Sequence, residues 1–204
     1  MNKLEKISQG KGFTLIELLV VIAILAVLAT AIILVINPAQ LLRQARDSTR
    51  TSDLAALNNA VSFYLADVLT PGLGGVNGAS CAAATETCTS SSTAARKTGG
   101  GACTTHNATT TVIGTGWITV DLVDISSGSP LARLPLDPNN GSTNCGAGNE
   151  ACYYSFICNG TAYEIDAAME STKFASGGGS DVESNTKDGG DDDNLYEVGN
   201  DLDI

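Results

Sequence analysis

The feature that most constrains this chain is an apolar run near its amino terminus, from Phe13 to Ile36, in which Glu17 is the only ionisable residue. As a helix, these 24 residues would be about 36 Å long at about 1.5 Å per residue. That length is enough to cross a hydrocarbon core of about 30 Å. The run therefore predicts a membrane-spanning helix, with the globular part of the 204-residue chain behind it.

The segment before the apolar run is short and basic, and it ends in a small residue. Lys3, Lys6 and Lys11 precede Gly12. A secretory signal has a shorter apolar region with its cleavage site behind it, whereas a cut at Gly12 would spare the helix. The lysines favour a cytoplasmic amino terminus, but three arginines follow the run within the distance that counts for orientation. We therefore expect a cleavage signal, rather than charge alone, to decide the orientation.

Glu17 lies one turn into the apolar segment. An unpaired carboxylate in a membrane helix costs at least about 2.5 kcal/mol, so this side chain needs a partner. Cleavage between Gly12 and Phe13 would create an α-amino group one helical turn from the carboxylate. That cation could pair with Glu17 of its own chain or of a neighbouring chain.

Gly12, Phe13 and Glu17, with the basic leader and the uninterrupted apolar run, resemble the class III signal of type IV pilins and type II secretion pseudopilins. The resemblance implies cleavage after Gly12 by a prepilin peptidase, N-methylation of Phe13, and polymerisation through the amino-terminal helix. The implied partners are identical and related pilin subunits, the peptidase, the pilus or secretion assembly platform, and the membrane. The implied location is the cytoplasmic (inner) membrane, crossed once with the amino terminus inside, and then an extracytoplasmic or cell-surface filament.

The predicted fold class is α+β, with a long amino-terminal helix packed on a small antiparallel β-sheet, as in pilins. Residues 1–12 are the expected leader peptide, and residues 13–36 are the expected transmembrane and filament-core helix. Residues 37–69 continue this helix in amphipathic form. Residues 70–204 form the expected globular β domain, with disulfide-bearing loops and an acidic carboxyl-terminal loop.

The helical continuation carries one apolar stripe. Pro38 lacks a backbone N–H and disfavours helical geometry in the residue before it, so we expect a kink or a local break there. Beyond it, Leu54, Leu57, Val61 and Tyr64 recur at spacings of three and four, which places them on one helix face that would pack on a sheet. The opposite side carries the charged residues Arg43, Arg46, Asp47, Arg50 and Asp53.

Two strand-like runs flank an Asn159-Gly160 pair, which predicts a β-hairpin with a type I′ turn. The runs are Cys152–Cys158 and Thr161–Met169. In the second run, alternate apolar residues would cover the helix stripe, while Glu164 and Asp166 point to the other side of the sheet.

Three further segments complete the expected domain. Trp117–Val123 alternates in polarity and predicts a strand, and Leu195–Val198 predicts a final edge strand. Residues 70–116 are rich in Gly, Ala, Ser and Thr, so we expect a long loop there, tied down by disulfides.

The cysteines are even in number, and all of them follow the apolar run. On the far side of a membrane this pattern predicts disulfides that compensate for a small core. A metal cluster is the alternative, but no pair has C-x-x-C spacing and the single histidine, His106, stands alone among threonines. Cys81 with Cys88 is the pair we expect first, because the loop between them is short. The remaining cysteines are Cys103, Cys145, Cys152 and Cys158.

The carboxyl-terminal tail, Asp181 to Ile204, holds nine acidic residues against Lys187 alone. Its acidic loop offers oxygen ligands on a flexible backbone, which suits calcium, although the spacing is not that of an EF-hand. A plain solvated acidic loop is the first interpretation, and a calcium site is the alternative. If calcium binds there, the expected ligands are Asp188, Asp191, Asp192 and Asp193.

No arrangement of residues typical of an enzyme is present, since the lone histidine lies in a threonine-rich stretch without a nucleophile motif. A net charge of -11 opposes nucleic-acid binding. The expected function is that of a structural protomer of a type IV pilus or a secretion pseudopilus, and Leu134–Gly141 leaves that choice open because it lacks the aromatic residue expected of a pseudopilin. The alternatives are a minor pilin for adhesion or DNA uptake, and a permanently anchored extracytoplasmic calcium-binding domain.

Overall fold

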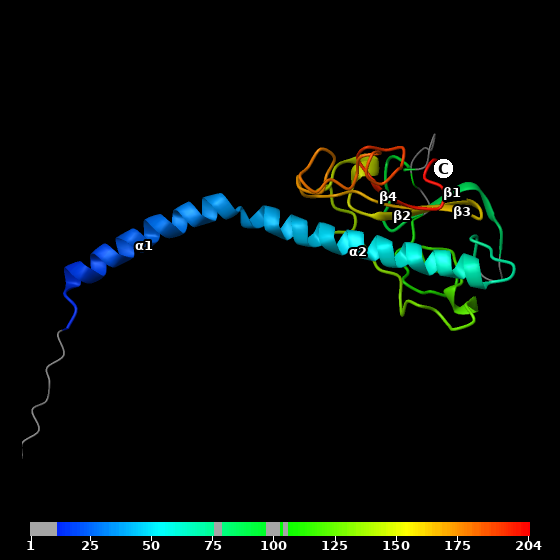
Figure 1. Cartoon of the computed structure of the whole chain (residues 1–204), viewed down its shortest axis with the longest axis horizontal. Coiled ribbons are helices and arrows are strands. Elements are labelled where there is room, and N and C mark those ends of the chain that lie inside the picture. Colours follow the sequence, from blue (N-terminus) through cyan, green and yellow to red (C-terminus); the bar gives the residue numbers. More distant parts are fainter. Residues whose placement is uncertain (1–11, 76–78, 97–102, 104–105) are drawn as a thin grey trace, which may run out of the picture. The chain divides into compact units, whose positions relative to one another are not determined.

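The structure is a computed structural model of the whole chain, and it describes residues 12–75, 79–96, 103 and 106–204 (Figure 1). The described residues fall into two compact units that divide between Leu41 and Leu42. Most of the predicted leader, residues 1–11, and parts of the predicted loop at residues 70–116 lie outside the described residues.

The first unit is built on helix α1, Leu15–Ile36, which is apolar throughout except for Glu17 and Thr30. The helix ends at Asn37, whose φ of 45° lies in the left-handed region. Asparagine tolerates this region better than most residues, and it caps helices there for that reason. Pro38 then begins helix α2, Pro38–Asp67, at a position where its missing N–H costs nothing. The predicted break before Pro38 is confirmed.

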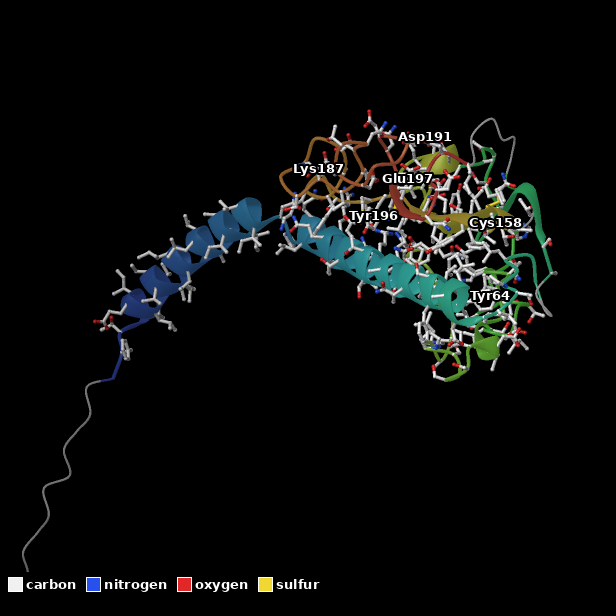
Figure 2. The ribbon with its side chains drawn as sticks, turned by 45° about the vertical axis from the view of Figure 1, so that its right-hand side comes forward. Tyr64, Cys158, Lys187, Asp191, Tyr196 and Glu197 are labelled. Carbon is white, nitrogen blue, oxygen red and sulfur yellow. A yellow bond between two sulfur atoms is a disulfide. The ribbon has the colours of Figure 1, made fainter. Side chains whose placement is uncertain are left out.

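The second unit packs α2 on one face of a four-stranded antiparallel sheet (Figure 1). The predicted stripe is confirmed, because its four side chains are all fully buried. Figure 2 shows Tyr64 near the end of α2 and Cys158 on the sheet. The largest core residues from helix and sheet are Leu54, Leu57, Val61, Tyr64, Phe156, Tyr163 and Ile165.

The strands are β1, Cys81–Cys88; β2, Tyr154–Gly160; β3, Ala162–Ala167; and β4, Tyr196–Gly199, in the spatial order β1-β2-β3-β4. The predicted hairpin and the predicted final edge strand are therefore confirmed. The strand β1 lies inside the stretch that was predicted to be loop. Its sequence, CAAATETC, has little β-branched or aromatic character, so it gives no strand signal.

The turn of the hairpin differs from the predicted type I′. Asn159 pairs with Ala162, so Gly160 and Thr161 are the two turn residues. Only Gly160 has a positive φ, of 64°. A type I′ turn needs a positive φ at both central residues, whereas type II′ needs it only at the first, where glycine is preferred. The glycine thus sets the turn, one residue later than the Asn-Gly rule placed it.

The predicted strand Trp117–Val123 is wrong. This segment is irregular, and its end belongs to a short 3-10 helix, η2, Leu122–Asp124. Trp117 donates its backbone N–H to Thr109 at 3.0 Å and its ring N–H to the carbonyl of Pro135 at 2.9 Å. The backbone therefore bonds to neighbouring loops instead of joining the sheet, although burial still alternates from Ile118 to Val123. A second 3-10 turn, η3, spans Gly148–Glu150.

The charged side of α2 is also buried in part, which corrects its prediction as a simple polar face. Arg50 and Asp47 are fully buried. The guanidinium of Arg50 donates Nε to Asp137 Oδ2 at 2.7 Å and Nη2 to Asp137 Oδ1 at 3.0 Å, and its Nη1 lies 2.6 Å from Asp47 Oδ1. Asp47 accepts two further bonds from the backbone N–H groups of Glu170 and Ser171, at 2.9 and 2.8 Å. Two distant chain segments thus close over this part of the helix.

A second arginine secures the same contact. Arg46 donates Nε to Glu170 Oε2 at 2.7 Å and Nη2 to Oε1 at 2.5 Å, which is a bidentate pair. The hydrogen bond from Arg46 holds the pKa of Glu170 below its ordinary value. Arg43 is more peripheral, with 3.8 Å between its Nε and Glu170 Oε1.

Candidate functional site

The Gly12–Phe13 junction precedes the first residue of α1 and is open to solvent. Phe13 is 89% exposed. A side chain added at Gly12 would meet no atom within 4 Å, so the fold of the described chain does not require glycine there. The junction is therefore accessible, and the described fold places no steric requirement on position 12.

The carboxylate of Glu17 is held at the amino terminus of α1 by a capping box. Its Oε2 accepts hydrogen bonds from the backbone N–H of Thr14 at 2.8 Å and from the Thr14 hydroxyl at 2.7 Å. In return, the N–H of Glu17 lies 3.3 Å from the Thr14 hydroxyl oxygen. A negative charge in this place is favourable because the helix dipole is positive there. The T-x-x-E spacing typical of this cap is visible in the sequence, although the cap was not predicted.

In the chain with its leader attached, Thr14 is thus the partner of Glu17. The predicted partner, the α-amino group of Phe13, forms only after cleavage, so that pairing stays a prediction. The capping box nevertheless fixes the carboxylate three residues after the N-cap, next to the bond whose cleavage would release the amine.

The surface of α1 is apolar on every side. Its large apolar side chains are between 48% and 85% exposed, and a span of 19 residues, Leu15–Ile33, has a mean hydropathy of 3.0. A helix that is hydrophobic all round belongs in a membrane or in the core of a larger assembly. By length and composition α1 can cross a membrane, and it needs lipid or other chains to cover it.

All six cysteines form disulfides, in the pairs Cys81–Cys158, Cys88–Cys103 and Cys145–Cys152. The predicted pair of Cys81 with Cys88 is wrong. The two residues stand at opposite ends of the extended strand β1, about 23 Å apart at about 3.3 Å per residue, whereas a disulfide needs a Cα–Cα distance near 5.5 Å. Cys81 instead reaches across to β2, where its Cα lies 5.9 Å from that of Cys158.

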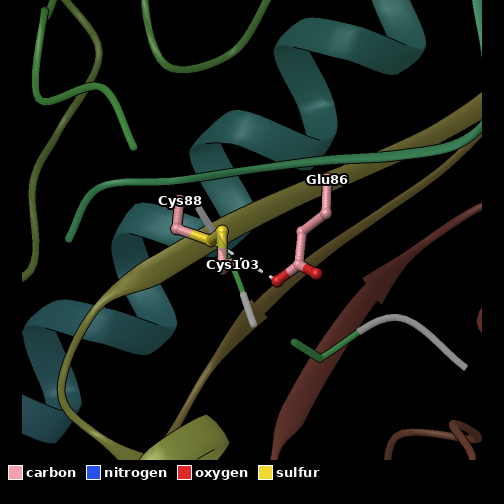
Figure 3. A group of neighbouring side chains, drawn as sticks. All are labelled: Glu86, Cys88 and Cys103. Atoms are coloured by element: carbon pink, nitrogen blue, oxygen red, sulfur yellow. Dashed lines mark hydrogen bonds between the residues drawn. A yellow bond between two sulfur atoms is a disulfide. The ribbon is translucent and has the colours of Figure 1, made fainter. Parts of the chain in front are cut away.

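Two disulfides have a carboxylate beside them. Figure 3 shows Glu86 with its carboxylate directed toward the Cys88–Cys103 bridge. Glu170 lies near the Cys145–Cys152 bridge in the same way. Because each sulfur is bonded to another sulfur, neither group offers the thiolates that a zinc site needs. The cysteine–metal alternative therefore finds no support in the described part of the chain.

The expected calcium ligands lie in the loops that lead to β4, and Figure 2 shows Asp191 there, before Tyr196 and Glu197. Asp188 accepts a hydrogen bond from the backbone N–H of Glu197 at 3.2 Å. Asp192 and Asp193 likewise accept bonds from nearby amide groups. In the described chain, no three of the four aspartates bring oxygens within 4.8 Å of one another. Calcium binding by this loop stays a prediction.

A tighter carboxylate group lies on the sheet itself. We define the carboxylate triad as Glu164 and Asp166 on β3 with Glu197 on β4. They are 2%, 0% and 2% exposed, and one carboxylate oxygen of each lies within 4.8 Å of one from each of the others. The sequence predicted that Glu164 and Asp166 would lie on the face of the sheet that points away from the helix. Their burial was not predicted, and neither was the presence of Glu197, which joins them only through strand pairing with Asp166.

Burial raises the pKa of every member of the carboxylate triad. The negative charge of Asp166 raises the pKa of Glu164 and of Glu197 further. The members of the triad therefore hold protons more readily than free carboxyl groups do, and these protons neutralise part of the negative charge.

Residues 8–33 match the family described as the prokaryotic N-terminal methylation motif. No curated protein and no solved structure matches the chain. The matched segment contains Gly12, Phe13, Glu17 and most of α1. This motif, the class III prepilin signal, indicates the type IV pilin and pseudopilin family, and the α+β fold with its long amino-terminal helix is pilin-like.

Proposed function

We propose that the chain is a structural protomer of a type IV pilus or a type II secretion pseudopilus, cleaved after Gly12 and polymerised through α1. One observation carries the proposal: a helix that is apolar all round carries a single carboxylate at its start, directly behind an open Gly-Phe junction. A permanent membrane anchor has no use for that carboxylate. A subunit that moves from lipid into a filament has one.

Cleavage would change the surroundings of Glu17 without moving it. The new α-amino group of Phe13 would stand one residue before Thr14, whose N–H and hydroxyl already hold the carboxylate. N-methylation leaves that amine basic, so it stays a cation. The cation can then compete for Glu17 within the chain or on a neighbouring subunit.

In the filament, pairing of the Phe13 amine with Glu17 would set the position of each subunit relative to its neighbours. A subunit docks fully only where the amine of Phe13 meets a carboxylate of Glu17 within the apolar helix bundle. Ion pairs in such surroundings often add little net stability, but removing one partner leaves an uncompensated charge that costs roughly 3 to 5 kcal/mol. The pair therefore destabilises a misplaced subunit by more free energy than it stabilises a correctly placed one.

The second unit would be the part that the filament displays. Its three disulfides suit an oxidising compartment outside the cytoplasm. Its partners would be identical and related subunits and the assembly platform. The net charge of -11 argues against the DNA-uptake alternative, because binding to the phosphate backbone relies on positive charge.

Recovery of sheared surface filaments tests the proposal in cells that carry a prepilin peptidase and a pilus or secretion assembly platform. The Glu17→Gln variant keeps the shape of the side chain and removes its charge. We expect filaments to fall by at least about tenfold, since an unpaired buried charge costs roughly 3 to 5 kcal/mol. The control is Thr14→Val, which removes the cap hydroxyl but keeps the carboxylate, and it should still yield filaments. Equal filament yields from wild type and Glu17→Gln would favour the permanently anchored domain instead.

A further inference from the structure

We propose that the carboxylate triad is a calcium site buried on the face of the sheet that points away from α2. It differs from the acidic loop at residues 188–193, because its oxygens come from paired strands. The proposal does not depend on filament assembly. It starts from the register of β3 and β4, in which Asp166 and Glu197 are direct partners and Glu164 precedes Asp166 by two residues on the same face.

Two carboxylate oxygens of the triad accept no hydrogen bond from a donor outside it. These oxygens, Glu164 Oε2 and Asp166 Oδ1, are both fully shielded from solvent. The second oxygen of Asp166 accepts from the Ser155 hydroxyl at 2.9 Å, and Oε2 of Glu197 accepts from the backbone N–H of Asp192 at 3.3 Å. Buried polar atoms are nearly always paired. These two oxygens therefore point to a ligand that supplies positive charge.

One cation of the described chain lies near the triad, and its charge favours the ionised form of Asp166. None of the ion pairs formed by the described residues involves the triad. Arg96 is the nearby cation, but its Nη1 donates to the backbone carbonyls of Tyr153 and Asp166, at 2.9 and 2.8 Å, and to the Ser155 hydroxyl at 3.2 Å. Its other two nitrogens donate to backbone carbonyls as well. Like charges on directly opposed strand residues destabilise a sheet, so a bound cation would stabilise the ionised form of this arrangement.

Calcium fits the donor set and its spacing. It binds carboxylate oxygens at about 2.3 to 2.6 Å, so ligands on opposite sides of the ion are about 4.6 to 5.2 Å apart. The oxygens of the triad lie within 4.8 Å of one another. The donors are all carboxylate oxygens, which suit a hard cation. Zinc prefers nitrogen and sulfur ligands, so the donor set fits calcium better.

The loop before β4 closes over one side of the triad. A side chain at Gly190 would overlap the carboxylate of Glu197, so that carboxylate would have to move. The φ of Gly190 is not in the left-handed region, and the requirement is therefore steric. Substitution at this position gives a way to disturb the triad while all three carboxylates are kept.

The test uses the full chain in detergent micelles, first treated with a chelator and then titrated with calcium chloride through about 10⁻⁴ to 10⁻³ M, the range of extracellular sites. Urea unfolding is followed by the fluorescence of Trp117, which is the only tryptophan and is fully buried. We expect the unfolding midpoint of the wild type to rise saturably with calcium. In Glu164→Gln, the calcium shift should be lost.

The matched control is Asp193→Asn in the acidic loop, an exposed side chain outside the triad, which should keep the full calcium shift. A shift that survives in Glu164→Gln, or one that vanishes in Asp193→Asn, would place the ion elsewhere and overturn the proposal. A wild type that does not respond to calcium would overturn it as well. Gly190→Ala provides a second variant if Glu164→Gln does not fold, and it should reduce the calcium shift.

Discussion

Replacing Arg50 by methionine should destabilise the second unit severely, although the substitution removes no apolar contact area. Arg50 is fully buried, and it makes two hydrogen bonds to Asp137 and one to Asp47. Without it, Asp137 keeps the backbone N–H of Asn139 at 2.7 Å but has lost its counter-charge.

The expected loss is about 3 to 5 kcal/mol, the usual cost of leaving a buried charge uncompensated. The lower end is favoured, because Asp47 keeps its two backbone N–H donors. A small domain has about 5 to 15 kcal/mol of total stability. With a urea m-value of about 2 kcal/mol/M, the Trp117 unfolding midpoint should fall by about 1.5 to 2.5 M.

Arg43→Met is the matched control for this measurement. Its side chain is 43% exposed and its Nε lies 3.8 Å from Glu170, so the expected loss is at most about 1 kcal/mol. Adding Asp137→Leu to Arg50→Met removes the orphaned charge and should recover much of the stability, as apolar replacements of buried pairs often do. If Arg50→Met costs no more than Arg43→Met, the buried pair does not hold this segment on α2, and the reasoning fails.

Two further predictions use the same unfolding assay. Replacing Cys81 and Cys158 by serine should cost about 4 kcal/mol of unfolding free energy, because that bridge closes a separation of 77 residues. Removing the Cys145–Cys152 bridge, with a separation of 7, should cost only about 2 kcal/mol. Equal losses would contradict the loop-entropy argument. Burial raises the pKa of Glu183 to about 7, so its stabilising contribution is complete below its ordinary value of 4.5 and is lost as pH rises through about 7. The fall in unfolding midpoint between those pH values should be smaller in Glu183→Gln, and an unchanged pH profile would argue against this sign.

The parts of the fold that could be predicted have local signals. The apolar stripe of α2 follows from spacings of three and four residues, and the hairpin follows from two alternating runs around Gly160. The processing signal is likewise a short, continuous stretch. Each of these depends on residues within about one turn or one strand of each other, where steric and hydrogen-bonding rules act directly.

The parts that could not be predicted depend on contacts between distant segments. Cys81 bonds to a residue 77 positions away, and Arg50 pairs with an aspartate 87 positions away. Trp117–Val123 alternates like a strand, yet the loops around it supply its hydrogen bonds and cover its side chains. In the sequence, Glu197 is not distinguished from the other acidic residues of the tail. Only strand pairing places it beside Asp166.

The intact mass of the membrane-extracted protein tests the central claim most directly. In cells that carry a prepilin peptidase, the account predicts a mature chain that begins at Phe13 with one added methyl group. A Gly12→Leu variant should stay uncleaved. Its second unit should unfold like that of the wild type, because a Cβ added at position 12 would meet no atom within 4 Å. A wild-type chain that still begins at Met1 would mean that the apolar helix is only an anchor, and it would contradict the account.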